Sequence, residues 1–313
     1  MSQFLVTGGA GFIGSNLCHA LVARGDAVRV LDNFSTGRAA NLADLGDRVQ
    51  VREGDVRDAA AVDEAMVGVE YVLHQAALPS VQRSIEEPLE SDRTNVLGTL
   101  NVLEAARRAG VRRVVFAASS SAYGETPTLP KVESMSPDPL SPYAVSKLAA
   151  EHYCKVYWHN YGLATVSLRY FNVFGPRQDP ASHYAAVIPR FVTAALRGEP
   201  PIIYGDGEQS RDFCFIDNCV EANLKACVAA DAEEQVYNVA CGERTTLLDV
   251  THQLSAIVGR QVTPRHEPAR SGDIRHSLAD ITRARRILGY TAAVSFAEGL
   301  RRTVEWYRQL AAR

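Results

Sequence analysis

Tyr143 and Lys147 are a pair whose types and spacing suggest proton chemistry in this sequence of 313 residues. They lie four residues apart in SPYAVSKLAAEHY, residues 141–153, where the spacing of apolar residues predicts a helix that begins near Pro142. Residues four apart share a helix face, so both side chains can point into one cleft. A free tyrosine, with a pKa near 10, is a poor base at neutral pH, and a nearby ammonium group would lower that pKa. The pair therefore predicts a tyrosine that can accept a proton.

Three consecutive serines precede this helix in AASSSAYG, residues 117–124. The run RVVFAAS before them predicts a strand over residues 113–119. Ligands bind at the carboxyl ends of the strands in open α/β sheets, so Ser119 and Ser121 are candidates for holding a substrate oxygen. The serines could instead only cap or turn the chain, and the residues alone leave both interpretations open.

The stretch FLVTGGAGFIGSNL places Gly8, Gly11 and Gly14 between a predicted strand and a predicted helix. Glycines allow a tight turn and let main-chain N–H groups approach a pyrophosphate at the helix N-terminus, although a tight turn alone would also use them. Asp32, at the end of the second predicted strand, is positioned to bind an adenosine ribose and to repel a 2'-phosphate. We therefore predict NAD binding rather than NADP binding, with Arg38 as the nearby residue that weakens this preference.

The elements that position these residues are short apolar strands in alternation with helical patterns. The predicted strands are FLVT (4–7), VRVLD (28–32), VQVREGD (49–55), YVLHQA (71–76), RVVFAAS (113–119) and TVSLRYF (165–171). Strict alternation with helices predicts a doubly wound parallel α/β sheet of the Rossmann type. Asp55, at the end of the third strand, either meets the adenine edge or caps the following helix.

A change in composition after Asn172 predicts a domain boundary. The sequence becomes rich in proline and glycine in NVFGPRQDP, and shorter elements follow. We predict an NAD-binding Rossmann domain over residues 1–172 and a smaller C-terminal α/β substrate domain over residues 173–313. Residues 213–240, with FCFID, a helical pattern and VYNVA, are expected to return to the first domain.

Composition argues against several classes of protein. A net charge of -3 gives no reason to expect nucleic acid or an anionic membrane surface as a partner. The six cysteines form no C-x-x-C pair, and no histidine stands at zinc-like spacing, so neither a metal site nor a disulfide framework is expected. No basic and apolar leader precedes FLV, and no apolar run approaches the roughly 20 residues that span a bilayer. We expect a cytoplasmic, soluble protein.

Together, VTGGAGFIG, SSSAYG, YAVSK and RYFNVFGPRQ resemble the extended short-chain dehydrogenase/reductases, essentially end to end. The resemblance is specifically to NAD-dependent UDP-sugar 4-epimerases of the UDP-galactose/UDP-N-acetylglucosamine 4-epimerase type. It implies reversible inversion at C4 of a UDP-hexose, through a 4-keto intermediate and transient hydride transfer to tightly bound NAD. Related dehydratases and decarboxylases carry T-D-E or T-S-E where this chain has three serines, which favours simple epimerisation.

The resemblance also implies roles for single residues. Tyr143 is expected to take the proton of the sugar O4, and Ser119 to bridge O4 and the phenol. Lys147 is expected to bind the nicotinamide ribose and, with the cationic nicotinamide, to lower the pKa of the tyrosine. The implied NAD contacts are Gly8, Gly11, Phe12, Ile13, Gly14, Asp32, Asn33, Ser35, Gly37, Asp55, Val56, Gln75, Ala76, Ala77, Asn95, Tyr143, Lys147 and Phe171.

The implied contacts to the UDP-sugar come from both predicted domains. They are Ser80, Ser119, Ser121, Tyr143, Asn172, Gln178, Ala186, Val187, Tyr204, Arg211, Arg270, Asp273 and Ser277. Arg211 and Arg270 match the family's diphosphate-binding arginines, whose guanidinium groups donate to phosphate in parallel pairs. Asp273 matches the carboxylate that takes a ribose hydroxyl.

The resemblance favours N-acetylated sugars. Ser277 stands where strict glucose/galactose epimerases carry a bulky tyrosine, and a small residue leaves room for an N-acetyl group. Gln178 and Ala186 agree with this preference, whereas Pro79 departs from the glycine found before Ser80 in close relatives. We predict UDP-GlcNAc and UDP-GalNAc as substrates, with UDP-glucose and UDP-galactose also turned over, because such pockets discriminate by only about 1–3 kcal/mol.

Several alternatives stay open at this stage. The chain could be a UDP-glucuronate 4-epimerase or another nucleotide-sugar enzyme of this superfamily, or, remotely, a non-catalytic NAD-sensing protein. His74 is expected to be structural and satisfied by the backbone, and His276 is ambiguous. Helices around residues 92–109 and 143–162 resemble the family's dimer interface and imply a homodimer, although their apolar faces could equally cover the sheet.

Overall fold

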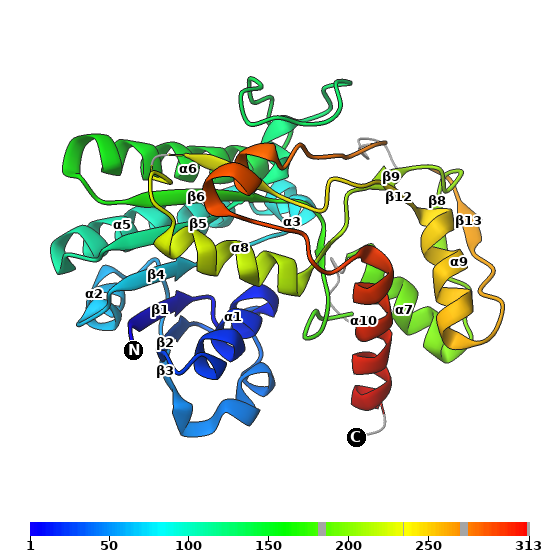
Figure 1. Ribbon diagram of the computed structural model, residues 1–313, viewed down its shortest axis with the longest axis horizontal. Coiled ribbons are helices and arrows are strands. Elements are labelled where there is room, and N and C mark those ends of the chain that lie inside the picture. Colours follow the sequence, from blue (N-terminus) through cyan, green and yellow to red (C-terminus); the bar gives the residue numbers. More distant parts are fainter. Residues whose placement is uncertain (181–185, 234, 270–274, 312–313) are drawn as a thin grey trace.

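The structure is a computed structural model in which residues 1–180, 186–233, 235–269 and 275–311 are described (Figure 1). Their largest unit is a parallel sheet of seven strands in the order β11, β6, β5, β4, β1, β2, β3. The bounds are β1 (Gln3–Thr7), β2 (Ala27–Asp32), β3 (Val49–Glu53), β4 (Tyr71–His74), β5 (Arg113–Ser119), β6 (Thr165–Tyr170) and β11 (Val236–Val239). The strand order reverses between β1 and β4, which is where a doubly wound sheet binds its ligands. The predicted Rossmann-type fold is confirmed.

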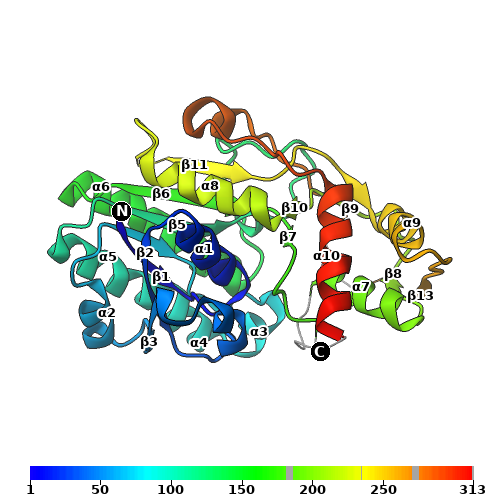
Figure 2. The same cartoon turned by 60° about the horizontal axis from the view of Figure 1, so that its bottom comes forward.

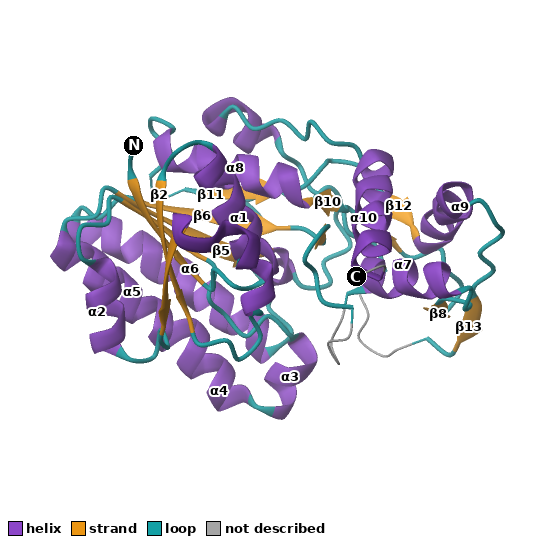
Figure 3. Ribbon diagram, turned by 90° about the horizontal axis from the view of Figure 1, so that it is seen from below, coloured by secondary structure: helices purple, strands orange, loops and turns teal. Residues whose placement is uncertain are grey.

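Helices cover both faces of this sheet. The first group comprises α1 (Phe12–Ala23), α2 (Ala59–Met66), α3 (Val81–Glu86), α4 (Pro88–Asp92), α5 (Gly98–Ala109), α6 (Pro142–Tyr161) and α8 (Ile216–Val228). Figure 3 shows α1 and α8 on one face and α2, α5 and α6 on the other. Side chains alternate accordingly, because Val114 and Phe116 of β5 pack on the face of α5 and α6, while Val115 packs on the opposite face.

A second group of elements lies at the other end of the molecule (Figure 2). It contains the helices α7 (Val187–Arg197), α9 (Leu247–Val258) and α10 (Phe296–Ala311). Its strands are β7 (Val173–Phe174), β8 (Ile202–Tyr204), β9 (Ser210–Arg211), β10 (Cys214–Phe215), β12 (Thr245–Thr246) and β13 (Arg265–Glu267). They pair two by two, with β7 beside β10 and β8 beside β13 in parallel, and β9 beside β12 antiparallel.

The chain crosses between the two groups more than once. β10 pairs with β7 in the second group. The elements that follow return to the large sheet, where α8 packs against it and β11 is its edge strand beside β6. One apolar cluster runs from Phe4 in β1 to Phe296 and Tyr307 in α10. The division into two domains stays a prediction. No helix among the described residues has the length and apolar character needed to cross a membrane.

Two strands end two residues earlier than predicted, for local reasons. The third ends at Glu53 because Asp55 begins a turn in which its main-chain oxygen accepts the N–H of Asp58. The fourth ends at His74, since the N–H of Ala76 donates to the hydroxyl of Thr7 instead of a strand carbonyl. Short 3₁₀ and π turns complete the described chain: η1 (Ala39–Asn41), η2 (Ala43–Arg48), η3 (Arg93–Leu97), η4 (Ser120–Tyr123) and η5 (Ala284–Leu288).

Candidate active site

The glycine loop between β1 and α1 is built for close backbone packing. Gly8 has a φ of +67°, and a Cβ atom there would lie 2.7 Å from the main-chain nitrogen of Ala76. A Cβ atom on Gly14 would lie 2.2 Å from the carbonyl oxygen of Gly8. Helix α1 begins after Gly11 without a side-chain cap, so the N–H groups at its first turn, which carries Phe12 and Ile13, suit an anionic pyrophosphate.

Asp32 is held beside this loop by two main-chain N–H groups. Its Oδ2 accepts a hydrogen bond from Ala10 at 2.9 Å, and its Oδ1 accepts one from Phe34 at 2.8 Å. Burial raises the pKa of this carboxyl, and the two backbone hydrogen bonds oppose that rise. A Cβ atom on Gly37 would lie 2.8 Å from Oδ1. The carboxylate therefore lies under the loop at the end of β2, the place where the sequence predicts the ribose contact.

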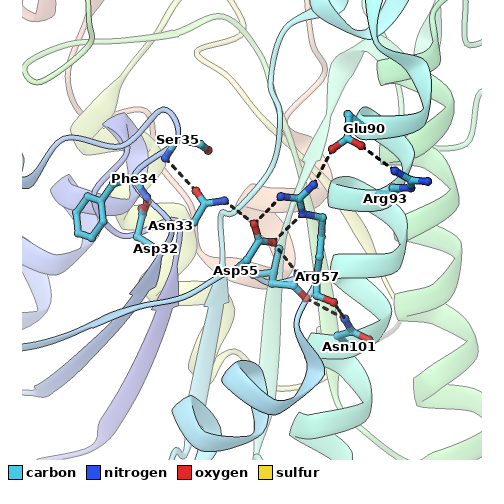
Figure 4. A network of polar contacts seen from close by, with 10 residues as sticks. Asp32, Asn33, Phe34, Ser35, Asp55, Arg57, Glu90, Arg93 and Asn101 are labelled. Carbon is cyan, nitrogen blue, oxygen red and sulfur yellow. Dashed lines mark hydrogen bonds and ion pairs between the residues drawn. The ribbon is translucent and has the colours of Figure 1, made fainter.

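Asp55 belongs to a polar network next to Asp32 (Figure 4). Its Oδ2 accepts hydrogen bonds from Asn33 at 2.7 Å and from Arg57 at 2.8 Å. Hydrogen bonds from Arg57 are the main reason that the pKa of Asp55 falls to about 2. The alternative role of helix cap is wrong for Asp55, because Asp58 caps α2 by accepting the N–H groups of Ala60 and Ala61. Ser35 joins through its N–H, which donates to Asn33 Oδ1 at 3.0 Å.

Tyr143 and Lys147 lie one turn apart near the start of α6. Ser141 caps this helix by accepting the N–H of Ala144, and Pro142 occupies the first turn. The ammonium group of Lys147 donates to the carbonyl oxygen of Ala117 at 2.8 Å. Burial lowers the pKa of Lys147 to about 7.

The pKa of Tyr143 differs from the sequence expectation. Burial raises this pKa, and a hydrogen bond with the side chain of Ser119 partly opposes the rise. Lys147 is not among the causes of this shift. With its own pKa lowered to about 7, the lysine is uncharged at the higher pH where Tyr143 loses its proton. The positive charge of a nicotinamide would be the additional cause that lowers the pKa of Tyr143.

The serines after β5 combine both roles considered from the sequence. Ser119 Oγ accepts hydrogen bonds from the N–H and the hydroxyl of Ser121, at 3.2 and 2.8 Å, and so caps the turn η4. Because Ser119 Oγ accepts from Ser121, its own proton is left to donate to Tyr143. By itself this hydrogen bond favours the phenolate form, while burial keeps the pKa of Tyr143 above its ordinary value.

Other predicted NAD contacts have structural partners in the protein. Asn95 binds the main chain of Leu78 and the hydroxyl of Ser146, at 2.8–3.3 Å. Gln75 bonds to Tyr170 and Asn223 through its amide. The remaining three lie near the carboxyl ends of the strands, with Val56 and Phe171 buried and Ala77 half-buried.

His74 is structural, as predicted, although side chains and not the backbone satisfy it. Its Nδ1 lies 2.6 Å from Thr7 Oγ1, and its Nε2 lies 3.0 Å from Thr99 Oγ1. Thr99 donates its own proton to Asn95 O, so Nε2 carries the ring proton and Nδ1 accepts. Burial is the main cause that lowers the pKa of His74 to about 3, and the histidine is neutral.

A cavity of about 290 Å³ in the second group of elements is the candidate nucleotide pocket. Five of the predicted substrate residues line it: Asn172, Ala186, Val187, Tyr204 and Arg211. Sequence reasoning missed its apolar wall, which includes Ile188, Phe191, Phe213 and Leu247, and the cation Arg190. The signal for two of these was the apolar spacing of IPRFV, which puts Ile188 and Phe191 on one face of α7.

The other predicted substrate residues lie outside the lining of this cavity. Ser80 caps α3 by accepting the N–H of Arg83 at 3.0 Å. The amide of Gln178 donates to Val173 O at 3.5 Å, and the N–H of Ser277 donates to Ser210 O at 3.0 Å. His276 Nδ1 lies 2.9 Å from Ser210 Oγ. Arg270 and Asp273 lie outside the described residues.

Comparisons with known proteins agree with this geometry. Residues 4–240 match the model of the NAD dependent epimerase/dehydratase family. A UDP-glucose 4-epimerase of Mycolicibacterium smegmatis is 41% identical over 97% of this chain and 98% of its own. The structure of UDP-glucose 4-epimerase from Thermotoga maritima with UDP-glucose is 38% identical, with a TM-score of 0.94 and 99% of both chains covered. UDP-N-acetylglucosamine 4-epimerase from Methanobrevibacter ruminantium, solved with UDP-N-acetylmuramic acid, is 39% identical, with a TM-score of 0.92 and the same coverage. The chain belongs to the NAD dependent epimerase/dehydratase family.

Proposed function

We propose that this chain is an NAD-dependent UDP-sugar 4-epimerase, with UDP-GlcNAc and UDP-GalNAc as its main substrates. The observation that carries the proposal is the junction of β5 with α6, where Lys147 donates to Ala117 O at 2.8 Å. It brings Ser119, Tyr143 and Lys147 together. This trio lies at the carboxyl end of the sheet, on the same edge as the glycine loop and Asp32. The 4-epimerases among the similar proteins support the same activity.

The proposed mechanism assigns proton movement to side chains of this protein. When bound at the glycine loop and Asp32, NAD supplies a group that accepts a hydride and gives it back. Tyr143 accepts the proton from the sugar O4 as C4 is oxidised to a ketone. It returns the proton to the same oxygen when C4 is reduced from its other face. Ser119 donates a hydrogen bond to the phenolate of Tyr143, while the positive charge of a protonated Lys147 stabilises it. No net redox change results, and C4 is inverted.

The preference for N-acetylated sugars is the finer part of the proposal. Ser277 is small and half-buried, and its main chain is fixed to Ser210 beside Arg211 of the pocket wall. One of the similar structures is a UDP-N-acetylglucosamine 4-epimerase, which supports the same substrate class. UDP-glucose and UDP-galactose are expected as slower substrates, since room for a large group admits a small one.

The proposal includes a homodimer in the cytoplasm. Apolar or aromatic side chains are exposed along α6 and the segment before α5: Leu97 (46%), Val145 (52%), Tyr153 (37%), Val156 (43%) and Tyr161 (55%). A surface of this kind favours contact with a second copy. All six cysteines are unpaired, which suits a reducing compartment.

Proton NMR of UDP-GlcNAc incubated with the protein and no added cofactor tests the proposal. We expect the anomeric signal of UDP-GalNAc to appear, because the bound cofactor is regenerated in each turnover. Inversion of UDP-glucose or UDP-glucuronate without that signal would keep the reaction and overturn the substrate preference. Lack of turnover with all three sugars, in protein shown to contain NAD, would overturn the epimerase assignment.

A further inference from the structure

Arg38 is the basic residue next to the proposed ribose site. The main chain at Gly37 lies against the carboxylate of Asp32, and the N–H of Arg38 donates to Ala10 O at 3.0 Å. Arg38 therefore directly follows the residue whose main chain lies against the Asp32 carboxylate, the group that is expected to bind the adenosine ribose. In proteins that bind NADP, an arginine at such a place accommodates the 2'-phosphate.

In this structure the guanidinium group of Arg38 is held by a distant residue. Its Nη2 lies 2.5 Å from Oδ2 of Asp179, which is 141 residues away in the sequence. The Asp179 side chain is 27% exposed and that of Arg38 is 54% exposed. Arg57, beside the adenine-side network of Asp55, is likewise held by carboxylates, those of Asp55 and Glu90 (Figure 4).

The position of Asp179 does not depend on this ion pair alone. Asn16 of α1 donates to Pro176 O at 3.1 Å and accepts from Arg177 at 3.0 Å. Tyr307 of α10 donates its hydroxyl proton to Gln178 O. The three residues before Asp179 are thus fixed by partners other than Arg38, and the carboxylate is presented to Arg38 from a segment with its own anchors.

We propose that Asp179 is a specificity residue for the cofactor, because it holds Arg38 away from the ribose 2' position and so denies NADP its cation. Asp32 repels the 2'-phosphate directly, and Asp179 adds a second barrier. The inference rests on the proposed function, in particular on Asp32 binding the adenosine ribose. A partly exposed ion pair contributes little to stability, so the effect of this pair on nucleotide choice is separable from folding.

The test is competition between the two nucleotides on the full chain. The protein is incubated with equal concentrations of NAD and NADP until the bound fractions are constant, separated from free nucleotide, denatured, and its nucleotides are quantified by chromatography. For Asp179→Ala we expect the ratio of bound NADP to NAD to rise about tenfold, the effect of one hydrogen bond to a charged group. Asp179→Asn removes the same charge with a smaller change of shape and is expected to raise the ratio in the same direction.

A double variant and a matched control identify the cause. Arg38→Ala and Arg38→Ala/Asp179→Ala should both keep the ratio of the unaltered chain, since neither variant has the guanidinium group that could bind the 2'-phosphate. Asp63→Ala, which breaks the exposed pair of Asp63 with Arg108 elsewhere on the surface, should also leave it unchanged.

Three results separate the possible failures. A ratio that stays within twofold in both Asp179 variants overturns the inference, and so does a rise that persists in the double variant. Asp32→Ala should raise the ratio by itself. If it does and the Asp179 variants do not, only this inference fails, whereas if neither raises it, the ribose site at Asp32 fails as well.

Discussion

The ammonium group of Lys147 lies 2.8 Å from the carbonyl oxygen of Ala117 and donates a hydrogen bond to it. This bond ties the start of α6 to the end of β5, two residues before Ser119. The tyrosine, the lysine and the serine are therefore positioned by one junction between a strand and a helix, and substitutions at this junction should act on turnover more than on binding.

Replacing Tyr143 with phenylalanine removes the proposed proton acceptor without changing the size of the ring much. We expect kcat to fall by about 10²- to 10⁴-fold, the usual contribution of a general acid–base group. The affinity for UDP-sugar should stay within a few-fold, as measured by calorimetry beside steady-state kinetics. Tyr153→Phe, on the exposed face of the same helix, is the control. Near-normal turnover in Tyr143→Phe would remove it from the mechanism.

His74 should make the protein sensitive to acid. Its pKa in the folded chain is lowered to about 3, so between that value and the ordinary pKa near 6.5 the unfolded chain binds the additional proton. The free energy of unfolding therefore falls as the pH falls through this window, by about 3 kcal/mol at pH 4 from this group.

Denaturant titrations of His74→Gln at pH 7 and pH 4 measure this contribution, since the variant should lose that part of the pH dependence. The exposed His252→Gln should keep it. Equal pH dependence in the His74 variant and the unaltered chain would mean that the buried histidine is not the source.

Ser277→Tyr should shift the substrate preference toward UDP-sugars that lack an N-acetyl group. A phenol ring in place of a hydroxymethyl group removes the space proposed for the N-acetyl group, so kcat/KM for UDP-GlcNAc relative to UDP-glucose should fall by about 10- to 200-fold. Kinetics with both sugars check this, and Ser277→Ala should keep the original ratio. An unchanged ratio in the tyrosine variant would show that residue 277 does not face the sugar.

The two glycines Gly8 and Gly25 share a positive φ but not their surroundings. At Gly25 a Cβ atom would meet nothing within 4 Å, so Gly25→Ala should cost about 1 kcal/mol of conformational strain. Gly8→Ala adds a contact of 2.7 Å with the main chain of Ala76, which should cost about 1–3 kcal/mol more and displace the loop that is proposed to bind NAD. Chemical denaturation and the NAD content of the purified variants measure both effects. Equal losses in the two variants would contradict the close packing at Gly8.

Cys241 should be the first thiol to react with iodoacetamide in the folded protein. A hydrogen bond with Cys214 lowers the pKa of Cys241, which is also partly exposed, whereas burial raises the pKa of Cys154, Cys219 and Cys227 to about 12. Peptide mass spectrometry after brief labelling identifies the modified residue, and Cys214→Ala should slow the reaction at Cys241. Earlier labelling at one of the buried cysteines would contradict this order.

The sequence predicted the parts of the fold that depend on periodicity. Six strands of the large sheet and α6 follow from alternating apolar runs, and the glycine loop follows from its spacing. The strands of the second group were not predictable in the same way, because β7, β9, β10 and β12 have two residues each and carry no period.

Side-chain partners distant in the sequence were equally beyond prediction. Asp58 and not Asp55 caps α2, a difference of three residues between two aspartates that both suit a cap. Asn95 uses its amide on Leu78 and Ser146, and Arg38 meets Asp179 across 141 residues. Such pairings depend on how the elements pack, and local sequence patterns do not predict this packing.

The trio on β5 and α6 and the cavity around α7 are built on different parts of the chain. The proposed reacting groups stand on β5 and α6, while the cavity is lined by α7 on one side and by very short strands and their connecting loops on the other. Irregular segments tolerate substitution better than sheets and helices do. New sugar preferences can therefore evolve here by exchange of wall residues on the irregular side, such as Phe213 between β9 and β10, with the proton-transfer apparatus left as it is.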